Sequence, residues 1–282
     1  MAQVRWVVCF LLVLLPQAAQ AGGKSEAMLN GGYRVELSSE EKPSGGYAVS
    51  IMYQRDGATL HAVESESSTA PHCQAYGDFP GKSYDTLACY TYSGGAHCCT
   101  TAYVFTVQGA AWWLSSMDYV EGELPDRVIP GEPFKRIEML HGPQGQPVPE
   151  IWDVTDFQRL LVWDDAKGWR KDKVGENSAY YLERFQDASK DEQERGPGMR
   201  EEYLEQYNPK DPFSPYSPDE LQGIALQIVY NGHMAGLETE KLAKEYERIF
   251  PQTKKVYESY IPFAEILKAA DTYNPVTFIH GQ

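Results

Sequence analysis

The sequence predicts an α+β protein in which a disulfide-braced antiparallel β region is followed by a helical region. Three observations support this prediction. Residues 22–175 contain β-rich runs broken by glycine turns, residues 176–282 are rich in charged, helix-forming residues, and the cysteines after the leader all fall in the first of these parts. With 42% hydrophobic and 23% charged residues, the 282-residue chain has enough apolar side chains to fill a core.

The first 21 residues predict a secretory signal peptide. One positive charge, Arg5, precedes an apolar run from Trp6 to Leu15, and the small residues Ala19 and Ala21 follow. This pattern predicts cleavage after Ala21 and a periplasmic or secreted protein. The apolar run is too short to span a bilayer and no later run reaches that length, so no stable membrane insertion is expected.

The charge of the chain argues against nucleic acid as a partner. Acidic residues outnumber basic ones by 40 to 25, which gives a formal net charge of −15. A protein of this sign repels a phosphate backbone, so no nucleic-acid binding is expected.

Three segments of the β region share one pattern, in which two β-rich runs flank a turn that contains glycine. The turns fall at Asp56–Gly57, at Gly109 and near Lys167–Gly168. Each segment predicts a β-hairpin, because glycine adopts the positive φ angles of tight turns. The hairpins span residues 47–64, 101–118 and 157–174, and their similarity suggests a degenerate repeat.

A fourth hairpin is predicted over residues 86–107, with its turn at Ser93–Ala96. If Gly94 and Gly95 form a two-residue loop, Cys89 faces Thr100 and Cys98 lies diagonally across from it. This register affects the expected disulfides.

Four cysteines remain once Cys9 leaves with the leader: Cys73, Cys89, Cys98 and Cys99. An even number in an exported protein predicts two disulfides. Neighbouring residues of a strand point to opposite faces, so Cys98 and Cys99 are expected to take different partners. The hairpin register favours Cys89–Cys98 with Cys73–Cys99 over the crossed arrangement.

A metal site is the alternative use of these cysteines, because His72 and His97 each precede one of them. Zinc sites space paired ligands two to four residues apart, and no C-x-x-C or H-x-x-x-H is present in this cluster. Structural disulfides are therefore the favoured interpretation, and no cofactor is predicted.

The stretch from Asp78 to Asp85, DFPGKSYD, leads into the strand of the fourth hairpin and the turn that follows it. This stretch resembles the FG-GAP or VCBS repeat of secreted bacterial β-proteins, and a fainter echo occurs at residues 151–156. The resemblance implies an acidic loop that binds calcium and repeats arranged as propeller blades. Here Pro80 and Lys82 replace two usual ligands, so Asp78 and Asp85 imply weak calcium binding or none. Three or four units are few for a closed propeller, so the implied fold is a partial propeller-like or irregular β assembly.

The helical region begins with a predicted helix over residues 176–195, which Gly196–Pro197–Gly198 is expected to end. A short helix over 199–207 and a proline-containing linker or loop over 208–216 follow.

Three further helices are predicted. Ser217 and Pro218 start one whose apolar residues recur at helical spacing: Leu221, Ile224, Ala225, Ile228 and Val229. The others cover residues 238–250, ending before Pro251, and 253–271, with a kink at Pro262.

The sequence assigns no catalytic residue. It lacks G-x-S-x-G, H-E-x-x-H, the P-loop and a G-x-G-x-x-G that opens a helix. His97, beside the glycine turn, could act as a base or ligand, but a role in bracing the turn is favoured because a single histidine without a partner specifies no chemistry.

Aromatic residues make up 12% of the chain and could form a platform for sugars or peptides. Trp112 and Trp113 are adjacent and so point to opposite faces of a strand, which favours burial of at least one. Core positions are the preferred interpretation for the tryptophans in this part of the chain: Trp112, Trp113, Trp152, Trp163 and Trp169.

These observations favour a non-enzymatic exported binding or interaction module, with an unidentified protein or envelope glycan as partner. The alternative is a hydrolase of envelope polymers that uses His97 or a carboxylate in a cleft between the two regions.

Overall fold

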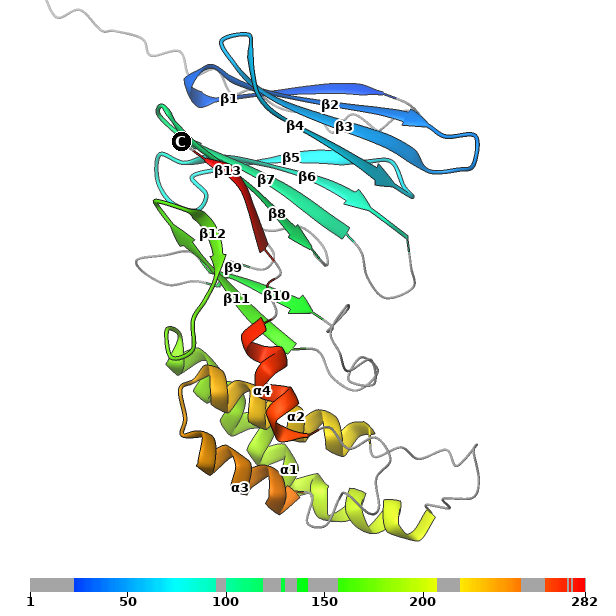
Figure 1. The fold of residues 1–282 in the computed structure, drawn as a ribbon, viewed down its shortest axis with the longest axis vertical. Coiled ribbons are helices and arrows are strands. Elements are labelled where there is room, and N and C mark those ends of the chain that lie inside the picture. The colour runs from blue at the N-terminus through cyan, green and yellow to red at the C-terminus, as the bar shows by residue number, and fades with distance from the viewer. Residues whose placement is uncertain are drawn as a thin grey trace, which may run out of the picture.

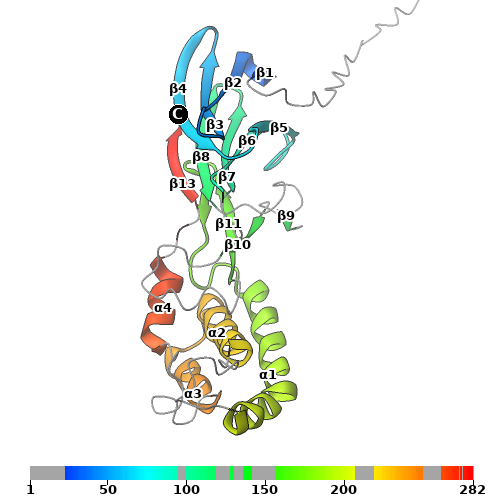
Figure 2. The same ribbon diagram turned by 90° about the vertical axis from the view of Figure 1, so that its right-hand side faces the viewer.

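The protein is an α+β protein, as the sequence predicts, and its strands form three antiparallel sheets (Figure 1). The computed structural model describes residues 23–94, 100–118, 128–129, 136–141, 157–206, 219–249, 262–272, 274 and 276–281. The predicted leader, residues 1–21, lies outside them. Figure 2 shows the helices at one end of an elongated molecule and the strands at the other.

The three sheets are named here by their places in the molecule. The outer sheet has the order β1-β2-β3-β4, the central sheet β13-β8-β7-β6-β5 and the third sheet β12-β11-β10-β9. The outer strands are β1 (Lys24–Leu29), β2 (Tyr33–Glu41), β3 (Tyr47–Arg55) and β4 (Ala58–Ser67), with a short 3-10 turn, η1 (Asn30–Gly32), between the first two. The central strands are β5 (His72–Gly77), β6 (Asp85–Tyr92), β7 (Thr100–Gln108), β8 (Ala111–Asp118) and β13 (Val276–Gly281). The third sheet contains β9 (Val128–Ile129), β10 (Arg136–His141), β11 (Phe157–Asp164) and β12 (Gly168–Lys171).

The three hairpins with glycine turns are confirmed as β3–β4, β7–β8 and β11–β12. Asp56 and Gly57 have φ angles of 49° and 81°, and Gly109 and Gly168 have φ angles of 59° and 74°. These left-handed conformations are the reason that glycine occupies the turns.

The outer and central sheets pack face to face as a sandwich. Alternate residues of β3, namely Val49, Ile51 and Tyr53, are buried against Phe105 and other inward residues of the central sheet. This period of two is the pattern expected when one face of a sheet covers a core.

The central sheet is covered on both faces. The side away from the outer sheet carries Tyr90, Val104 and Trp113, which join Trp163 and Trp169 of the third sheet in a second cluster. In β6 every residue from Thr86 to Thr91 is buried. Two-sided burial explains why this strand shows little polar alternation in the sequence.

The predicted register of the β6–β7 hairpin is wrong. Tyr92 pairs with Thr100, and Cys89 pairs with Tyr103 instead of Thr100. Because strand side chains alternate, a shift of three residues exchanges the two faces of β7. The observed register turns Phe105 towards the outer sheet, where it packs in the sandwich core.

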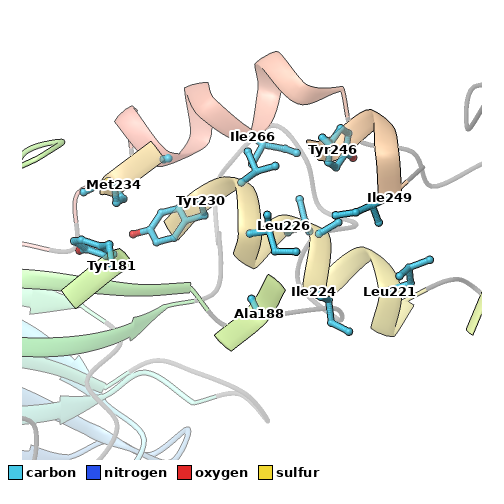
Figure 3. Close-up of a cluster of buried hydrophobic side chains, with 14 of the residues drawn as sticks. Tyr181, Ala188, Leu221, Ile224, Leu226, Tyr230, Met234, Tyr246, Ile249 and Ile266 are labelled. Carbon is cyan, nitrogen blue, oxygen red and sulfur yellow. The ribbon is translucent and has the colours of Figure 1, made fainter. Parts of the chain in front are cut away.

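The helices are α1 (Ser178–Gln206), α2 (Asp219–Met234), α3 (Thr239–Ile249) and α4 (Phe263–Thr272). Figure 3 shows α2 in the middle of their core, with Leu226 and Tyr230 between side chains of the other helices. The predicted apolar face of α2 is confirmed, since Leu221, Ile224, Ala225, Ile228 and Val229 are all buried. Among the described residues, no helix is both long enough and apolar enough to cross a membrane.

The predicted stop at Gly196–Gly198 is wrong, because α1 continues through Pro197 to Gln206 and includes the separate helix expected after it. The buried Glu192 carboxylate lies 2.7 Å from the Arg200 guanidinium, beyond the Gly–Pro–Gly segment, and also pairs with Arg248 of α3. These pairs join the two sides of the segment and help offset the hydrogen bond that proline cannot donate.

The remaining helices follow the prediction more closely. α3 corresponds to the helix expected over 238–250, and α4 begins directly after Pro262. Residues 253–261, the first part of the last predicted helix, lie outside the described residues, as does the expected linker over 208–216.

The end of the predicted helical region contains a strand. β13 pairs antiparallel with β8 and forms an edge of the central sheet. The chain therefore returns from the helices to the β region (Figure 1). The sequence VTFIHG, with its β-branched and aromatic residues, carries the signal for this strand.

Candidate functional site

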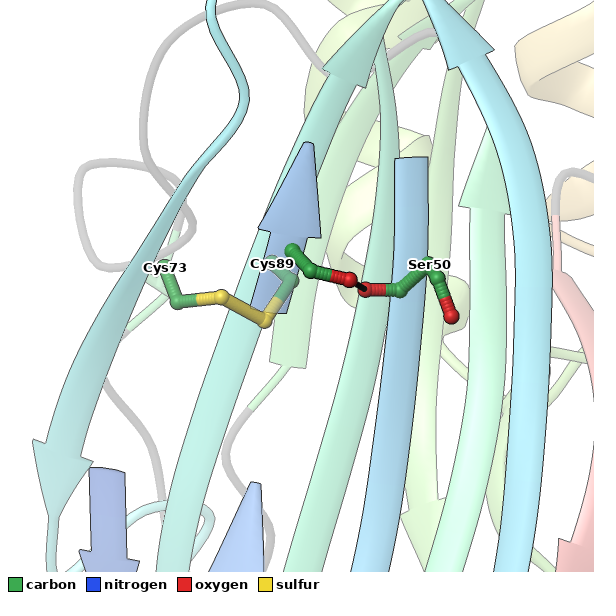
Figure 4. Close-up of a disulfide and its surroundings, with 4 residues drawn as sticks. Ser50, Cys73 and Cys89 are labelled. Carbon is green, nitrogen blue, oxygen red and sulfur yellow. Dashed lines mark hydrogen bonds between the residues drawn. A yellow bond between two sulfur atoms is a disulfide. The ribbon is translucent and has the colours of Figure 1, made fainter. Parts of the chain in front are cut away.

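The structure contains a disulfide between Cys73 and Cys89, which are opposite each other on β5 and β6 (Figure 4). This bond replaces both pairings expected from the sequence, Cys89–Cys98 with Cys73–Cys99 and the crossed arrangement. The expectation failed because it depended on the register of β6 and β7, whereas the bond joins β6 to its other neighbour. Cys98, Cys99 and His97 lie outside the described residues.

The alternative metal site also loses two of its sulfur ligands. Cys73 and Cys89 are joined to each other, so neither is available as a thiolate. His72 stacks on Tyr90, with ring centres 5.0 Å apart.

The two carboxylates of the FG-GAP-like loop bind backbone groups of the protein. Ser83 N donates to Asp78 Oδ1 at 3.2 Å, and Asn30 N donates to Asp85 Oδ2 at 3.0 Å. Between them, Phe79 is buried and stacks on Trp169 of the third sheet. In the described part of the chain, no three His, Cys, Asp or Glu side chains gather in a way that could hold a metal ion.

The tryptophans are core residues wherever the structure describes them. Trp112 lies in the sandwich core, while Trp113, Trp163 and Trp169 pack between the central and third sheets. The rings meet edge to face, with centres 5.1 Å apart for Trp113–Trp163 and 5.4 Å apart for Trp163–Trp169. The core interpretation is therefore confirmed for these four, and Trp152 lies outside the described residues.

The carboxylate of Asp165 lies at the edge of this aromatic cluster. Asp165 Oδ1 accepts hydrogen bonds from Tyr84 Oη at 2.7 Å and from Trp163 Nε1 at 2.8 Å. Burial, with Asp165 beside it, raises the pKa of the Tyr84 hydroxyl. The β11–β12 turn is thereby fixed to the loop that precedes β6.

Charged side chains gather most densely at the junction between the third sheet and the helices. Arg159 of β11 is only 3% exposed, and its Nε lies 2.9 Å from Asp172 Oδ1. Its two terminal nitrogens donate to the main-chain oxygens of Ala270 at 2.8 Å and Asp172 at 2.6 Å. One guanidinium therefore links β11, the end of β12 and the last turn of α4.

Neighbouring groups complete this buried network. Asn177 Nδ2 donates to Asp172 Oδ2 at 3.1 Å, and the hydroxyl of Tyr181 accepts a hydrogen bond from Leu160 N at 3.0 Å. Burial raises the pKa of the Asp172 carboxyl, against the opposing pull of Arg159. Burial also raises the pKa of the Tyr181 hydroxyl, so it stays neutral.

The positively charged side chain of Lys171 also binds the C-terminal end of α4. Lys171 Nζ donates to the main-chain oxygen of Asp271 at 2.7 Å. Burial, and then the nearby positive charge of Arg159, lower the pKa of this amine. Lys171 and Arg159 together satisfy two carbonyls in the last turn of α4, where the helix dipole favours positive charge.

The exposed rim of the junction holds a histidine–carboxylate pair. His233 Nε2 of α2 lies 2.8 Å from Asp271 Oδ1 of α4. A carboxylate in this position orients the imidazole ring. This pair was not predicted, because the two residues lie on different helices and neither belongs to a sequence motif.

The junction and the aromatic cluster join the described sheets and helices to one another. The sequence showed the tryptophans but gave no sign of Arg159 or Asp172, whose roles depend on a long-range contact. Comparisons with protein-family models, with curated proteins and with solved structures find no match to this chain.

Proposed function

We propose that this protein is an exported binding module that presents the outward face of its outer sheet to a protein partner. The disulfide between Cys73 and Cys89 is compatible with an oxidising compartment, and the leader-like residues 1–21 support export.

The observation that carries the proposal is the openness of this face. The other face of the outer sheet covers the sandwich core, and the central sheet is enclosed on both sides. In both ribbon views no described helix or strand lies over the outward face of β1–β4 (Figure 1, Figure 2). A broad sheet surface is therefore available to a partner.

The chemistry of this face fits a polar partner better than an apolar one. Ser50 Oγ donates to Glu64 Oε1 at 2.8 Å, and the small side chains of Ala48 and Ala62 are exposed beside this pair. Met28, which is 64% exposed, adds one apolar side chain to the same face. Arg34 lies 2.6 Å from Glu26, so part of the charge is paired within the sheet.

Acidic side chains are exposed near one end of the face. Glu40, Glu64 and Glu66 are all exposed, and the whole chain is acidic. Charge complementarity therefore favours a partner surface with lysine and arginine. An envelope glycan is the alternative ligand, because carboxylates and hydroxyls also bind sugar hydroxyls.

The rest of the molecule supports this face as a rigid base. The buried Arg159 network fixes the third sheet to the helices, and the aromatic cluster fixes the third sheet to the central sheet. A preorganised surface loses less conformational entropy when it binds.

The experiment is site-specific photo-crosslinking in the producing cell. A photoreactive residue replaces Ala48 or Ala62 on the face, or Glu247 on the exposed side of α3 as a control. We expect a discrete protein adduct at the two sheet positions and none at Glu247. Substituting Glu64→Lys and Glu66→Lys together should remove the adduct while the melting temperature stays within a few degrees.

Adducts of equal yield at all three positions, or no adduct at either sheet position, would contradict the proposal. Adducts that contain glycan instead of protein would favour the alternative ligand.

A hydrolase of envelope polymers remains a second candidate because of one observation. His233 and Asp271 form their pair at the junction of the β and helical regions, and the alternative expectation from the sequence is a hydrolase that uses a residue between these regions. If this candidate is correct, the purified protein should solubilise labelled cell-wall polymer, and His233→Ala should abolish that activity. No release by the wild-type protein would eliminate it.

A further inference from the structure

Two histidines that are far apart in the sequence meet at the edge of the sandwich. His61 lies on β4 of the outer sheet and His280 on β13 of the central sheet, and their ring centres are 6.2 Å apart. Both side chains are partly exposed, so the pair is open to solvent.

Each histidine stands beside an irregularity in its strand. In the β3–β4 ladder, Tyr53 pairs with His61 and Gln54 with Thr59, so Leu60 has no opposite residue. The β13–β8 ladder shows the same feature, because Phe278 and His280 have consecutive partners on β8 and the residue between them is skipped.

A β-bulge of this kind redirects the side chain next to it. Here two independent bulges, in different sheets, accompany imidazoles whose rings lie close to each other at a tilted angle. The skipped residues, Leu60 and Ile279, both pack against the sandwich core and supply apolar surroundings for the pair.

The ring of His280 has unused hydrogen-bonding capacity. Its Nδ1 is buried and has no hydrogen-bond partner among the described residues, and its ring stacks on Trp112 with centres 4.7 Å apart. A buried ring nitrogen without a protein partner requires another explanation, of which a bound ion is one.

We propose that His61 and His280 form a binding site for a divalent transition-metal ion of the zinc class. Imidazole nitrogen is a preferred ligand of zinc, nickel and copper ions. Two imidazoles on one tetrahedral zinc ion, with zinc–nitrogen bonds of about 2.0 Å, have ring centres roughly 5 to 5.5 Å apart. The two rings here, with centres 6.2 Å apart, therefore bind one ion after moving closer by roughly 1 Å.

Water completes the coordination, since the site supplies two protein ligands at a solvent-accessible rim. The acidic chain, with its net charge of −15, attracts cations. A bound ion joins β4 to β13 and so fixes the edge of the central sheet to the outer sheet.

The test is calorimetric titration of the oxidised full chain with zinc chloride at pH 7.5. His61→Gln and His280→Gln each remove one ligand and should weaken the zinc affinity by at least about tenfold. His72→Gln is the matched control, because His72 lies on β5 at the opposite edge of the same sheet and should leave zinc binding unchanged.

Zinc should also raise the melting temperature of the wild type and of His72→Gln, and raise it less in the other two variants. The melting temperatures without zinc show whether each variant is folded, and His61→Gln provides the test if His280→Gln is not.

The proposal is overturned if the wild type binds no zinc. It is equally overturned if His61→Gln and His280→Gln bind zinc as the wild type does, or if His72→Gln weakens binding as much as they do. The last two results would place the ion elsewhere in the chain.

Discussion

Arg159 links the third sheet to the helices through several contacts. It pairs with Asp172 and donates to the main chain of Ala270, and both charged side chains are almost completely buried. Such a pair contributes to the free energy of unfolding only when both partners are present, because a lone buried charge is poorly solvated.

Arg159→Met should therefore lower the free energy of unfolding by about 3–5 kcal/mol, because it leaves the Asp172 carboxylate without its cation. The double variant Arg159→Met with Asp172→Leu should regain a substantial part of that loss, since no isolated charge remains. Urea denaturation of the wild type, the two single variants Arg159→Met and Asp172→Leu, and the double variant measures both effects. If the double variant loses as much free energy of unfolding as the two single variants lose together, the broken ion pair is not the cause of the loss.

At the scale of elements, α1 is the clearest example of tertiary contacts overriding local preference. It passes through Gly196, Pro197 and Gly198 without ending. A Cβ at Gly196 would lie 2.7 Å from Glu192 Oε1, whereas a Cβ at Gly198 would meet no atom within 4 Å.

Replacing each of these two glycines with alanine should therefore have opposite effects on the free energy of unfolding. Gly198→Ala should stabilise the protein by about 0.5–1 kcal/mol, the usual gain of alanine over glycine in a helix. Gly196→Ala should give no gain, or a loss, because its methyl group displaces the carboxylate that holds Arg200. Chemical denaturation distinguishes them, and an equal gain in both would show that the Glu192 contacts do not limit the packing.

The contact between α1 and α3 should be sensitive to acid. Burial acts to raise the pKa of the Glu192 carboxyl, but hydrogen bonds from Arg248 and Arg200 outweigh it and hold the pKa below the ordinary value of 4.5. A carboxyl with a lowered folded pKa contributes its full stability above pH 4.5 and loses it as the pH falls through the folded value.

Glu192→Gln should therefore cost about 2 kcal/mol at pH 7, and the difference from wild type should shrink as the pH falls below 4.5. Unfolding free energies from pH 7 to pH 3 test this dependence. Glu194→Gln is the control, because Glu194 is exposed and lies 3.9 Å from Lys190, so its effect should be small at every pH. A pH-independent cost for Glu192→Gln would contradict the electrostatic explanation.

At the scale of the whole molecule, α4 is held from both sides. Arg159 and Lys171 bind its last turn to the third sheet, and β13, which follows it, pairs with β8 of the central sheet. These links couple the helices to the third and central sheets.

The protein should therefore unfold in a single calorimetric transition, with equal van't Hoff and calorimetric enthalpies. In Arg159→Met the helical core should melt at a lower temperature than the sandwich and give a second, earlier peak. Two separate peaks in the wild-type protein would contradict the coupling.

The sequence predicted those parts of the fold that depend on neighbouring residues. Turns at Asp56–Gly57 and Gly109, and the apolar face of α2, follow from local periodicity and from the conformations glycine permits. The pairing of Cys73 with Cys89 and the register of β6 against β7 were missed, because two-sided burial removes the alternation that would fix a register.

The candidate sites were still less accessible from the sequence. Arg159, Asp172 and Asp271 belong to no motif, and their meeting depends on how α4 docks against β11 and β12. His61 and His280 come together only because a strand at residues 276–281 returns to the central sheet. Contacts between segments so distant in the chain leave no periodic trace.

The place of β13 in the chain also governs the order in which the protein can be completed. During synthesis, β5–β8 emerge long before residues 276–281, and the described helices α1–α4 come between them. Until then the unpaired backbone groups at the β8 edge can hydrogen-bond to strands of other chains. The newly made protein therefore remains prone to aggregation until residues 276–281 have been synthesised and β13 has paired with β8.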